Sequence, residues 1–327
     1  MKKKVSVVII GKNEEKNILR CITSVKNTIE YMKRQIETVY IDSGSNDNTI
    51  LNITTNHSDV KIFRISDVEI KTASKGRHLG ALVCEGEYIL FLDADMEIHN
   101  RFLTNILSIA DDNSEFIGGI GIRNDIFLSE GIRVKTHANV YNTFEETDCR
   151  HFGGALFIKK DFLIRIGNYG SAIVANEEAE LHSRILKNGK NIKEYPFEMI
   201  NHYIYQEENK KSWKNLLFGS RNQGIGQGFR HSMQRNSTLN FIRRFDLFFL
   251  TLAVDITSLV LILVLKANFY SLLVTLLTQL ILGSLYVIKG KLKFYILNRI
   301  YAIHFFKGVL NYGSNNQIEY TQINNLD

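Results

Sequence analysis

Cysteine is scarce in this chain, and its spacing excludes two common uses of that residue. Only three cysteines occur among the 327 residues, at positions 21, 84 and 149. They lie far apart, their number is odd, and no C-x-x-C pair occurs. A disulfide framework or a structural zinc site needs paired or clustered cysteines. We therefore expect the reduced thiols of a cytosolic domain.

The N-terminus offers no export signal. The lysines at positions 2–4 resemble the charged start of a signal peptide, but the apolar run behind them, Val5–Ile10, is too short. That run is β-branched, which favours a central parallel strand. We expect the N-terminal domain to stay in the cytosol.

No strong excess of charge of one sign marks the chain as a nucleic-acid binder. Its formal net charge is +6, from 40 Lys and Arg against 34 Asp and Glu. The basic residues gather only around Arg243–Arg244 and Lys289–Lys293, beside apolar segments. This pattern favours a membrane surface, and no nucleic acid, as the partner.

The most informative stretch is Tyr88–Asp95, which reads YILFLDAD. A short apolar run of this kind is typical of a strand buried in a parallel sheet. Asp93 and Asp95 follow it, where open α/β sheets place their ligands. Their carboxylates point the same way and repel each other, so a divalent metal between them is the expected partner. The alternative is a strand followed by a helix that is capped by Asp95.

Alternating strand and helix patterns surround this stretch and predict an α/β fold with a doubly wound, mostly parallel sheet. The expected strands are Val5–Ile10, Glu37–Ile41, Val60–Ile65 and Tyr88–Leu92, with helices over Glu14–Met32, after Thr49, and over Lys75–Cys84. The turn over 42–49, DSGSNDNT, ends the second strand and is rich in polar ligand-binding residues. Lys75 and Arg77 would neutralise a diphosphate, and Gly76 and Gly80 would allow close approach of the backbone.

A second acidic group lies at the start of a predicted helix that is N-capped by Asn176. Glu178, Leu181 and Ile185 share one face of that helix, whereas Glu180 and Arg184 can pair on the other. Acids favour the first turn of any helix, which is the ordinary explanation for Glu177 and Glu178. A carboxylate beside an apolar stripe also has a raised pKa, which suits a general base.

The last third of the chain is strongly apolar. Phe245–Leu265 and Ala267–Ile288 are each long enough to cross a bilayer, and together they predict a transmembrane helical hairpin. Flanking cations place both ends in the cytosol. Asp255 either faces a partner helix or marks a shallow first segment. The alternative is a hairpin buried in a large soluble protein.

The segments beside the hairpin are less apolar. The range 294–310 carries scattered cations and predicts an interfacial helix. The polar tail after Tyr312 is expected to be disordered. The glycines of Arg221–Gly228 predict a flexible loop at the membrane face, where Arg221 could meet a phosphate or sugar.

Six ordered motifs over roughly residues 5–230 resemble those of family 2 glycosyltransferases with the GT-A fold, and the membrane-attached bacterial members that build surface polysaccharides look most similar. The motifs are Asn13-Glu14-Glu15, Asp42-Ser43-Gly44-Ser45-x-Asp47-x-Thr49, Gly76-Arg77, Asp93-Ala94-Asp95, Gly153-Gly154 and Glu177-Glu178-x-Glu180-Leu181-x-x-Arg184.

The resemblance implies a role for each matching residue. It assigns the nucleotide-sugar to Gly11, Asn13, Glu15, Asp42, Arg77 and Asp93. It assigns Mn²⁺ or Mg²⁺ to Asp95, Asp93 and His202, the acceptor side to Gly153, Gly154 and Arg221, and the catalytic base to Glu178. Because the family's base is an aspartate, Glu177 remains an alternative to Glu178.

The resemblance therefore implies an inverting, metal-dependent hexosyltransferase for surface glycan synthesis. It would move a sugar from a UDP- or GDP-sugar to a hydroxyl of a lipid-linked or glycan acceptor. The usual proline after the first strand is absent, and no Q-x-x-R-W motif indicates a processive synthase. A polyprenyl-phosphate sugar synthase, a sugar-nucleotidyltransferase and an inactive membrane scaffold are the alternatives.

We expect a multi-pass protein of the cell membrane with its catalytic domain in the cytosol. The predicted divisions are a GT-A domain over 1–230, a linker over 231–244, the hairpin with its interfacial helix over 245–311, and the tail over 312–327.

Overall fold

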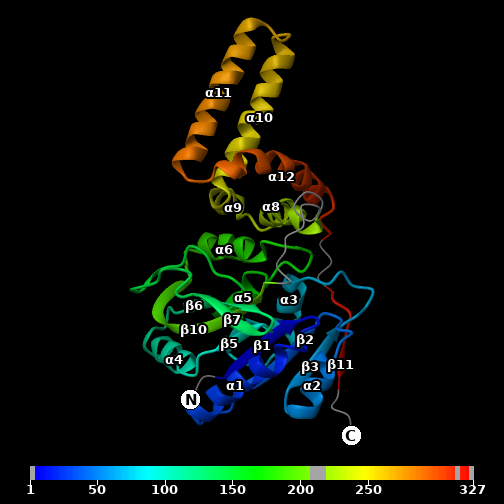
Figure 1. Ribbon diagram of the computed structural model, residues 1–327, viewed down its shortest axis with the longest axis vertical. Helices are drawn as coiled ribbons and strands as arrows, with labels where there is room; N and C mark the ends of the chain where they lie inside the picture. Colours follow the sequence, from blue (N-terminus) through cyan, green and yellow to red (C-terminus); the bar gives the residue numbers. More distant parts are fainter. Residues whose placement is uncertain (1–3, 207–218, 314–316, 324–327) are drawn as a thin grey trace.

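The computed structural model describes residues 4–206, 219–313 and 317–323. Its first part alternates strands and helices, as the sequence predicts (Figure 1). The elements are β1 (Val5–Gly11), α1 (Ile18–Met32), β2 (Glu37–Asp42), α2 (Thr49–Asn56), β3 (Lys61–Ile65), α3 (Ala73–Val83) and β4 (Tyr88–Asp93).

Strands β3, β2, β1 and β4 lie side by side in that order and are all parallel. Their apolar residues are buried on both faces, which explains why β1 is β-branched at every position from Val5 to Ile10 except Ser6. In the register, Gly11 lies opposite Asp42 and Ile10 lies opposite Asp93. The carboxyl ends of these strands therefore meet at one edge of the sheet.

The sheet becomes mixed beyond β4. Among the described residues it has eleven strands, in the order β11-β3-β2-β1-β4-β9-β6-β10-β5, with β7 on β6 and β8 on β10. Strand β9 is antiparallel to both β4 and β6, whereas β6 and β10 are parallel. The further elements are β5 (Met96–Ile98), α4 (Phe102–Asp112), β6 (Gly118–Ser129), β7 (Ile132–His137), β8 (Thr147–Asp148), β9 (Leu156–Lys159), α5 (Lys160–Arg165), α6 (Glu177–Lys187) and β10 (Lys193–Tyr205).

Helix α1 begins one turn later than the predicted Glu14. Asn13 has a left-handed backbone, with φ of 57°. The backbone N–H groups of Asn13 and Glu14 donate to the Ser45 and Thr49 hydroxyls of the turn after β2. Because these hydrogen bonds hold Asn13 and Glu14 against the turn after β2, the regular helix starts only at Ile18.

The predicted N-cap of α6 is wrong in its chemistry, although its position is right. Asn176 precedes the helix with φ of 63° and makes no side-chain capping bond. Asparagine tolerates this left-handed conformation better than most residues, which is its role here. The predicted pair of Glu180 and Arg184 forms, at 2.7 Å, but it is buried and not on a solvated face.

The predicted flexible glycine loop is helical. Residues Ser220–Gln223 form the short helix η1, and Gly224–Gln234 form α8. A Cβ on Gly226 would lie 2.0 Å from the backbone oxygen of Phe305 in α12 (Leu292–Leu310). The glycines therefore permit close helix packing and do not provide flexibility. Helix α9 (Thr238–Arg244) occupies much of the predicted linker.

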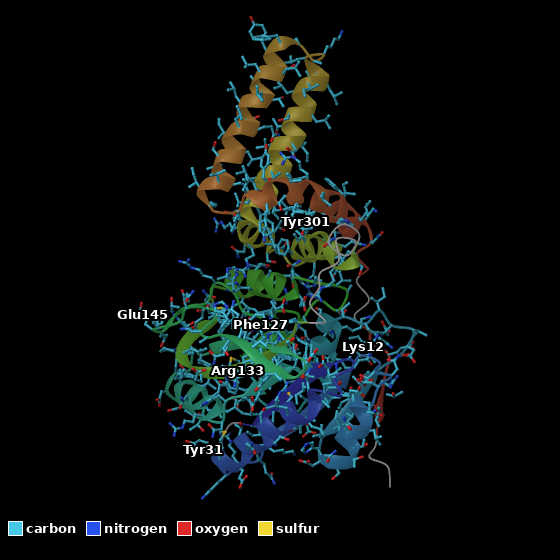
Figure 2. The ribbon with its side chains drawn as sticks, viewed as in Figure 1. Lys12, Tyr31, Phe127, Arg133, Glu145 and Tyr301 are labelled. Atoms are coloured by element: carbon cyan, nitrogen blue, oxygen red, sulfur yellow. The ribbon has the colours of Figure 1, made fainter. Side chains whose placement is uncertain are left out.

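Two apolar helices form an antiparallel hairpin that stands away from the α/β domain (Figure 1). They are α10 (Asp246–Val264) and α11 (Phe269–Ile288), with mean hydropathies of 2.6 and 2.0. Only 22% of the most apolar stretch of α10 and 17% of that of α11 is buried, and Figure 2 shows the side chains of the hairpin to be mostly carbon. By length and composition, both could cross a membrane.

Asp255 faces partner helices, which was one of its two expected settings. Its Oδ1 accepts hydrogen bonds from Gln279 of α11, at 2.9 Å, and from Arg299 of α12, at 3.0 Å. Arg299 also donates to the Gln279 side chain at 2.7 Å. This polar cluster ties α12 across the base of the hairpin, because each polar group finds its partner on another helix.

Part of the C-terminal tail is ordered, contrary to the expectation of disorder. Strand β11 (Tyr320–Ile323) pairs antiparallel with β3 at the edge of the sheet. Ile318 and Ile323 pack against the main core. The tail thus covers an edge strand that would otherwise expose its backbone.

Candidate active site

A cavity of about 400 Å³ opens at the edge where β1 and β4 end. It brings together Asp93, Asp95, Arg77, Glu177 and Glu178, as the sequence predicts. Five of its lining side chains are acids and four are bases. The lining residues are Ile10, Gly11, Lys12, Glu14, Ser43, Lys71, Thr72, Ala73, Arg77, Asp93, Ala94, Asp95, Glu177, Glu178 and Arg221.

Arg77, on α3, is the centre of the cavity's charge network. Its Nη2 donates to Asp93 Oδ1 at 2.6 Å, and its Nη1 donates to Glu177 Oε1 at 2.7 Å. Glu178 Oε1 lies 3.5 Å from the same Nη1. Arg77 is only 2% exposed. Although burial opposes its charge, Asp93, Glu178 and Glu177 hold the pKa of Arg77 above its ordinary value.

The two candidate base carboxylates differ in their surroundings. Glu177 is 6% exposed and bonded directly to Arg77. The Glu178 side chain is 23% exposed and has the looser contact. Burial raises the pKa of Glu178 to about 7; the neighbouring Glu177 adds to this shift and Arg77 opposes it. Glu178 is therefore the carboxylate that can exchange a proton near neutral pH.

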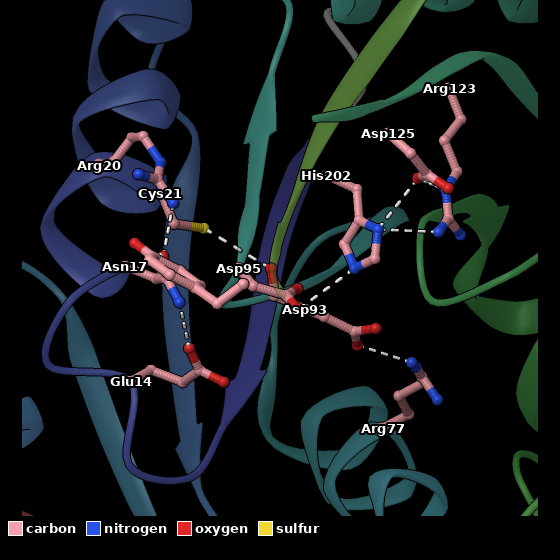
Figure 3. A network of polar contacts seen from close by, with 11 residues as sticks. Glu14, Asn17, Arg20, Cys21, Arg77, Asp93, Asp95, Arg123, Asp125 and His202 are labelled. Carbon is pink, nitrogen blue, oxygen red and sulfur yellow. Dashed lines mark hydrogen bonds and ion pairs between the residues drawn. The ribbon is translucent and has the colours of Figure 1, made fainter. Parts of the chain in front are cut away.

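Asp95 belongs to a separate polar chain, shown in Figure 3. Its Oδ2 lies 3.2 Å from His202 Nε2, and His202 Nδ1 lies 3.0 Å from Asp125 Oδ1. Arg123 donates to Asp125 at 2.7 Å. Burial lowers the pKa of His202, but the hydrogen bonds to Asp125 and Asp95 outweigh it and raise the pKa to about 9.

The donor set for a metal is partial. Asp95 Oδ1 is buried and has no hydrogen-bond partner, which suits a ligand position. Asp93, in contrast, is committed to Arg77, and burial raises its pKa. No group of three or more His, Cys, Asp or Glu side chains is arranged around a metal position in the described ranges. Asp95, together with His202 once it has released its proton, would fit a cation that takes its other ligands from phosphate and water.

Three of the predicted nucleotide-binding residues lie beside the cavity and not in its lining. Asp42 is fully buried, and its carboxylate accepts the backbone N–H groups of Gly44 and Ser45. Asn13 and Glu15 accept backbone N–H groups of Asn46 and Asn48. These side chains hold the turns after β1 and β2 together, whereas Gly11 lines the cavity.

The acceptor-side predictions also divide. Arg221, at η1, lines the cavity. A Cβ on Gly154 would lie 2.0 Å from Asp93 Oδ2 and 2.7 Å from Arg77 Nη2, so this glycine makes room for their ion pair. A Cβ on Gly153 would lie 3.1 Å from the Arg123 guanidinium. Both glycines thus contact the charged network directly.

Sequence reasoning missed several cavity residues. Lys12, labelled in Figure 2, lies just beyond the end of β1, and Lys71 reaches the cavity from the loop before α3. Glu14 lines both this cavity and a neighbouring one of about 320 Å³, which also contains Asp95, His202 and Tyr205. The position of Lys12 directly after a predicted strand was the available signal, whereas Lys71 lies in a loop without a pattern.

The sheet is mixed, and carboxylates lie at the carboxyl ends of its parallel strands. Solved structures share this fold. GalNAc-T7, crystallised with UDP, GalNAc and Mn²⁺, has a TM-score of 0.52 at 17% identity over 74% of this chain and 56% of that one. S. aureus TarS 1-349, in complex with UDP-GlcNAc, has a TM-score of 0.50 at 16% identity over 74% of this chain and 72% of that one. The fold is therefore GT-A.

The family follows from the sequence. Residues 6–167 match the family described as Glycosyl transferase family 2. The poly(ribitol-phosphate) beta-N-acetylglucosaminyltransferase TarP of Staphylococcus aureus (strain N315) is 32% identical over 124 residues. That match covers 37% of this chain and 37% of TarP, just over a third of the relative's length. The N-terminal part of the chain, residues 6–167, is therefore that of a family 2 glycosyltransferase.

The fit around Gly154 gives a first test. We expect Gly154→Ala to destabilise the protein by about 1–3 kcal/mol, because its methyl group would overlap the Asp93–Arg77 pair. Urea unfolding followed by circular dichroism would measure the change. Gly313→Ala is the control, because no atom lies within 4 Å of its added Cβ. Equal losses in both variants would contradict the packing described here.

Proposed function

We propose that the chain is an inverting glycosyltransferase that uses UDP-GlcNAc as its donor. The cavity that joins Asp95 to Glu178 carries this proposal, because it places a diphosphate-binding edge beside a carboxylate of raised pKa. Uridine is preferred to guanosine because TarS 1-349 was solved with UDP-GlcNAc and TarP is named an N-acetylglucosaminyltransferase.

The charges of the cavity suit a diphosphate only with an added cation. Five acids and four bases line it, so the ionised cavity is slightly negative before an anionic donor enters. Lys12, Lys71 and Arg77 supply positive charge, yet Arg77 is shared among carboxylates. Asp95 and His202 would hold Mn²⁺ or Mg²⁺, which would supply the remaining positive charge beside the leaving diphosphate.

The transfer step assigns one proton and one bond to this chain's side chains. Glu178 takes the proton from an acceptor hydroxyl, and the acceptor oxygen forms a bond to the anomeric carbon. The bond from that carbon to the diphosphate oxygen breaks, and its electron pair leaves with the diphosphate. Arg77 and Lys12 stabilise the resulting charge. Attack from the side opposite the leaving group inverts the anomeric configuration.

We further propose that α10 and α11 cross the cell membrane and hold the cavity at its cytosolic face. Their side chains are largely exposed and apolar. The cations at Arg243, Arg244, Lys289 and Lys291 lie at one end of the hairpin, the arrangement of the positive-inside rule. A lipid-linked acceptor for a surface glycan would then reach the cavity from the bilayer.

The base assignment predicts a pH-dependent rate. In the wild type, kcat/KM for UDP-GlcNAc should rise as the pH passes through about 7 and level off above it, because only the carboxylate form of Glu178 accepts a proton. We expect Glu178→Gln to lower kcat by roughly 10²–10⁴-fold and to remove this limb. Initial rates of UDP release would measure both the fall in kcat and the loss of the limb. The range of pH 5–9 covers roughly two units on either side of the pKa.

Two further variants make the base assignment specific. Glu177→Gln should change the rate through the Arg77 contact and keep a pH limb, moved to lower pH because the charge of Glu177 no longer raises the pKa of Glu178. Glu30→Gln removes an exposed acid on α1 and is the matched control. If Glu178→Gln kept the full rate and limb, the assignment of the base would fail. A lipid phosphate acceptor needs little base assistance, so that result would favour a polyprenyl-phosphate sugar synthase instead.

Labelling with thiol reagents tests the membrane topology. All three native cysteines are buried, which gives a low background. We expect Ala267→Cys, at the hairpin tip, to react with a membrane-impermeant maleimide in intact cells. Glu30→Cys, in the α/β domain, should react only after the cells are permeabilised. Labelling of Glu30→Cys in intact cells, or none at Ala267→Cys, would contradict the proposed topology.

A further inference from the structure

A second pocket lies between the α/β domain and the hairpin. It has a volume of about 330 Å³ and is lined by residues from α6, α9 and the segment before β9. Five of its lining side chains are basic or imidazole groups, and none of the described lining residues is acidic. We call the site formed by Arg150, His151, His182, Arg243 and Arg244 the basic pocket.

Among the described residues, no carboxylate forms an ion pair with Arg150, Arg243 or Arg244, although the charge of Glu178 acts on Arg244. Arg244 donates to the backbone oxygen of Arg150, not to a carboxylate. His182 Nε2 contacts the side-chain oxygen of Asn191 at 2.8 Å. Asp148, which lies close enough to act on His182, is paired with Lys193 at 2.7 Å. The pocket therefore gathers three arginine cations that an incoming anion would stabilise, beside two histidines whose pKa is lowered.

The crowding of cations is visible in the electrostatics of its members. Burial lowers the pKa of His151, and the charges of Arg244, His182 and Lys291 lower it further. Lys291 belongs to the turn between α11 and α12, so the positive region extends to the base of the hairpin. Like charges held this close are unfavourable unless an anion binds between them.

The basic pocket adjoins the catalytic cavity along α6. Ala179, which lines the pocket, directly follows Glu178, which lines the cavity. His182 lies four residues after Glu178, about one helical turn of 5.4 Å away. Arg244 is close enough to Glu178 for their charges to interact. An anion in the pocket would therefore lie beside the catalytic base but outside the donor cavity.

The basic pocket also adjoins the apolar hairpin. Arg243 and Arg244 end α9, and α10 starts at Asp246. Figure 1 shows α6 and α9 between the sheet and the hairpin. A cationic site at the start of an apolar helix lies at the level of lipid headgroups when the helix enters a bilayer. This position favours a lipid phosphate over a phosphate of a soluble polymer.

We propose that the basic pocket binds the phosphate group of a membrane-lipid acceptor and holds it one helical turn from Glu178. At this separation, a sugar attached to that phosphate could place its hydroxyl group beside Glu178. The acceptor role rests on the proposed glycosyl transfer, whereas binding of the phosphate group does not.

Binding of a short-chain lipid to the full-length protein in neutral detergent tests this site without donor or turnover. We expect dihexanoyl phosphatidic acid to bind at least about tenfold more tightly than dihexanoyl phosphatidylcholine or inorganic phosphate, measured by isothermal titration calorimetry. The double variant Arg150→Gln and Arg243→Gln should weaken that binding by about tenfold or more. Both side chains are exposed, so the variant should fold.

Arg101→Gln is the matched control, because Arg101 is exposed before α4, far from the pocket. This variant should bind the phosphatidic acid as tightly as the wild type does. Equal binding of the two lipids, or binding unaffected by the double variant, would overturn the proposal. Equal affinity for inorganic phosphate would show a free-phosphate site. Tighter, arginine-dependent binding of a soluble ribitol-phosphate oligomer would assign the pocket to a polymer instead. Failure of UDP-GlcNAc binding would affect only the proposed donor.

Discussion

The bonding of Arg77 to the carboxylates around it is the constraint on which the cavity at the ends of β1 and β4 depends. A single buried guanidinium holds Asp93 at the end of β4 and Glu177 at the start of α6. It thereby joins two segments that lie 84 residues apart in the chain. Removing one partner of a buried ion pair typically costs about 3–5 kcal/mol, because it leaves charge uncompensated. With Glu177 occupied in this way, Glu178 keeps a looser contact and a pKa near 7.

The remaining architecture fixes the positions of these groups. The register of β1, β2 and β4 aligns their carboxyl ends, and the turns after β1 and β2 are bonded to each other through Asn13, Glu15 and Asp42. Close packing of α8 on α12 at Gly226 connects the α/β domain to the base of the hairpin. Helix α6 lines both this cavity and the basic pocket, and it lies between the sheet and the apolar hairpin (Figure 1).

Local sequence pattern predicted the helices and strands well. It predicted poorly which distant segments of the chain contact them. The apolar runs of β1 and β4 and the acids of Asp93 and Asp95 are confirmed at a cavity, because hydrophobic pattern and strand polarity act over a few residues. The glycines of α8 were wrongly predicted to form a loop. They are needed because the backbone of α12, about 80 residues away, packs closely against them. Disorder was wrong for Tyr320–Ile323 for the same kind of reason: only the edge of β3 makes that strand. Site roles carried over from the family resemblance remain predictions, and Asp42 shows why, because its carboxylate caps its own turn.

Calorimetric titration of UDP into the protein, with Mn²⁺ and then with EDTA, tests the central claim most directly. We expect clear binding with Mn²⁺, and loss of this metal-dependent binding both in EDTA and in Asp95→Asn, which removes the negative charge of the carboxylate whose buried Oδ1 has no hydrogen-bond partner. Circular dichroism of Asp95→Asn would confirm that its fold is intact. UDP binding of equal strength with Mn²⁺, with EDTA and in Asp95→Asn would contradict the account.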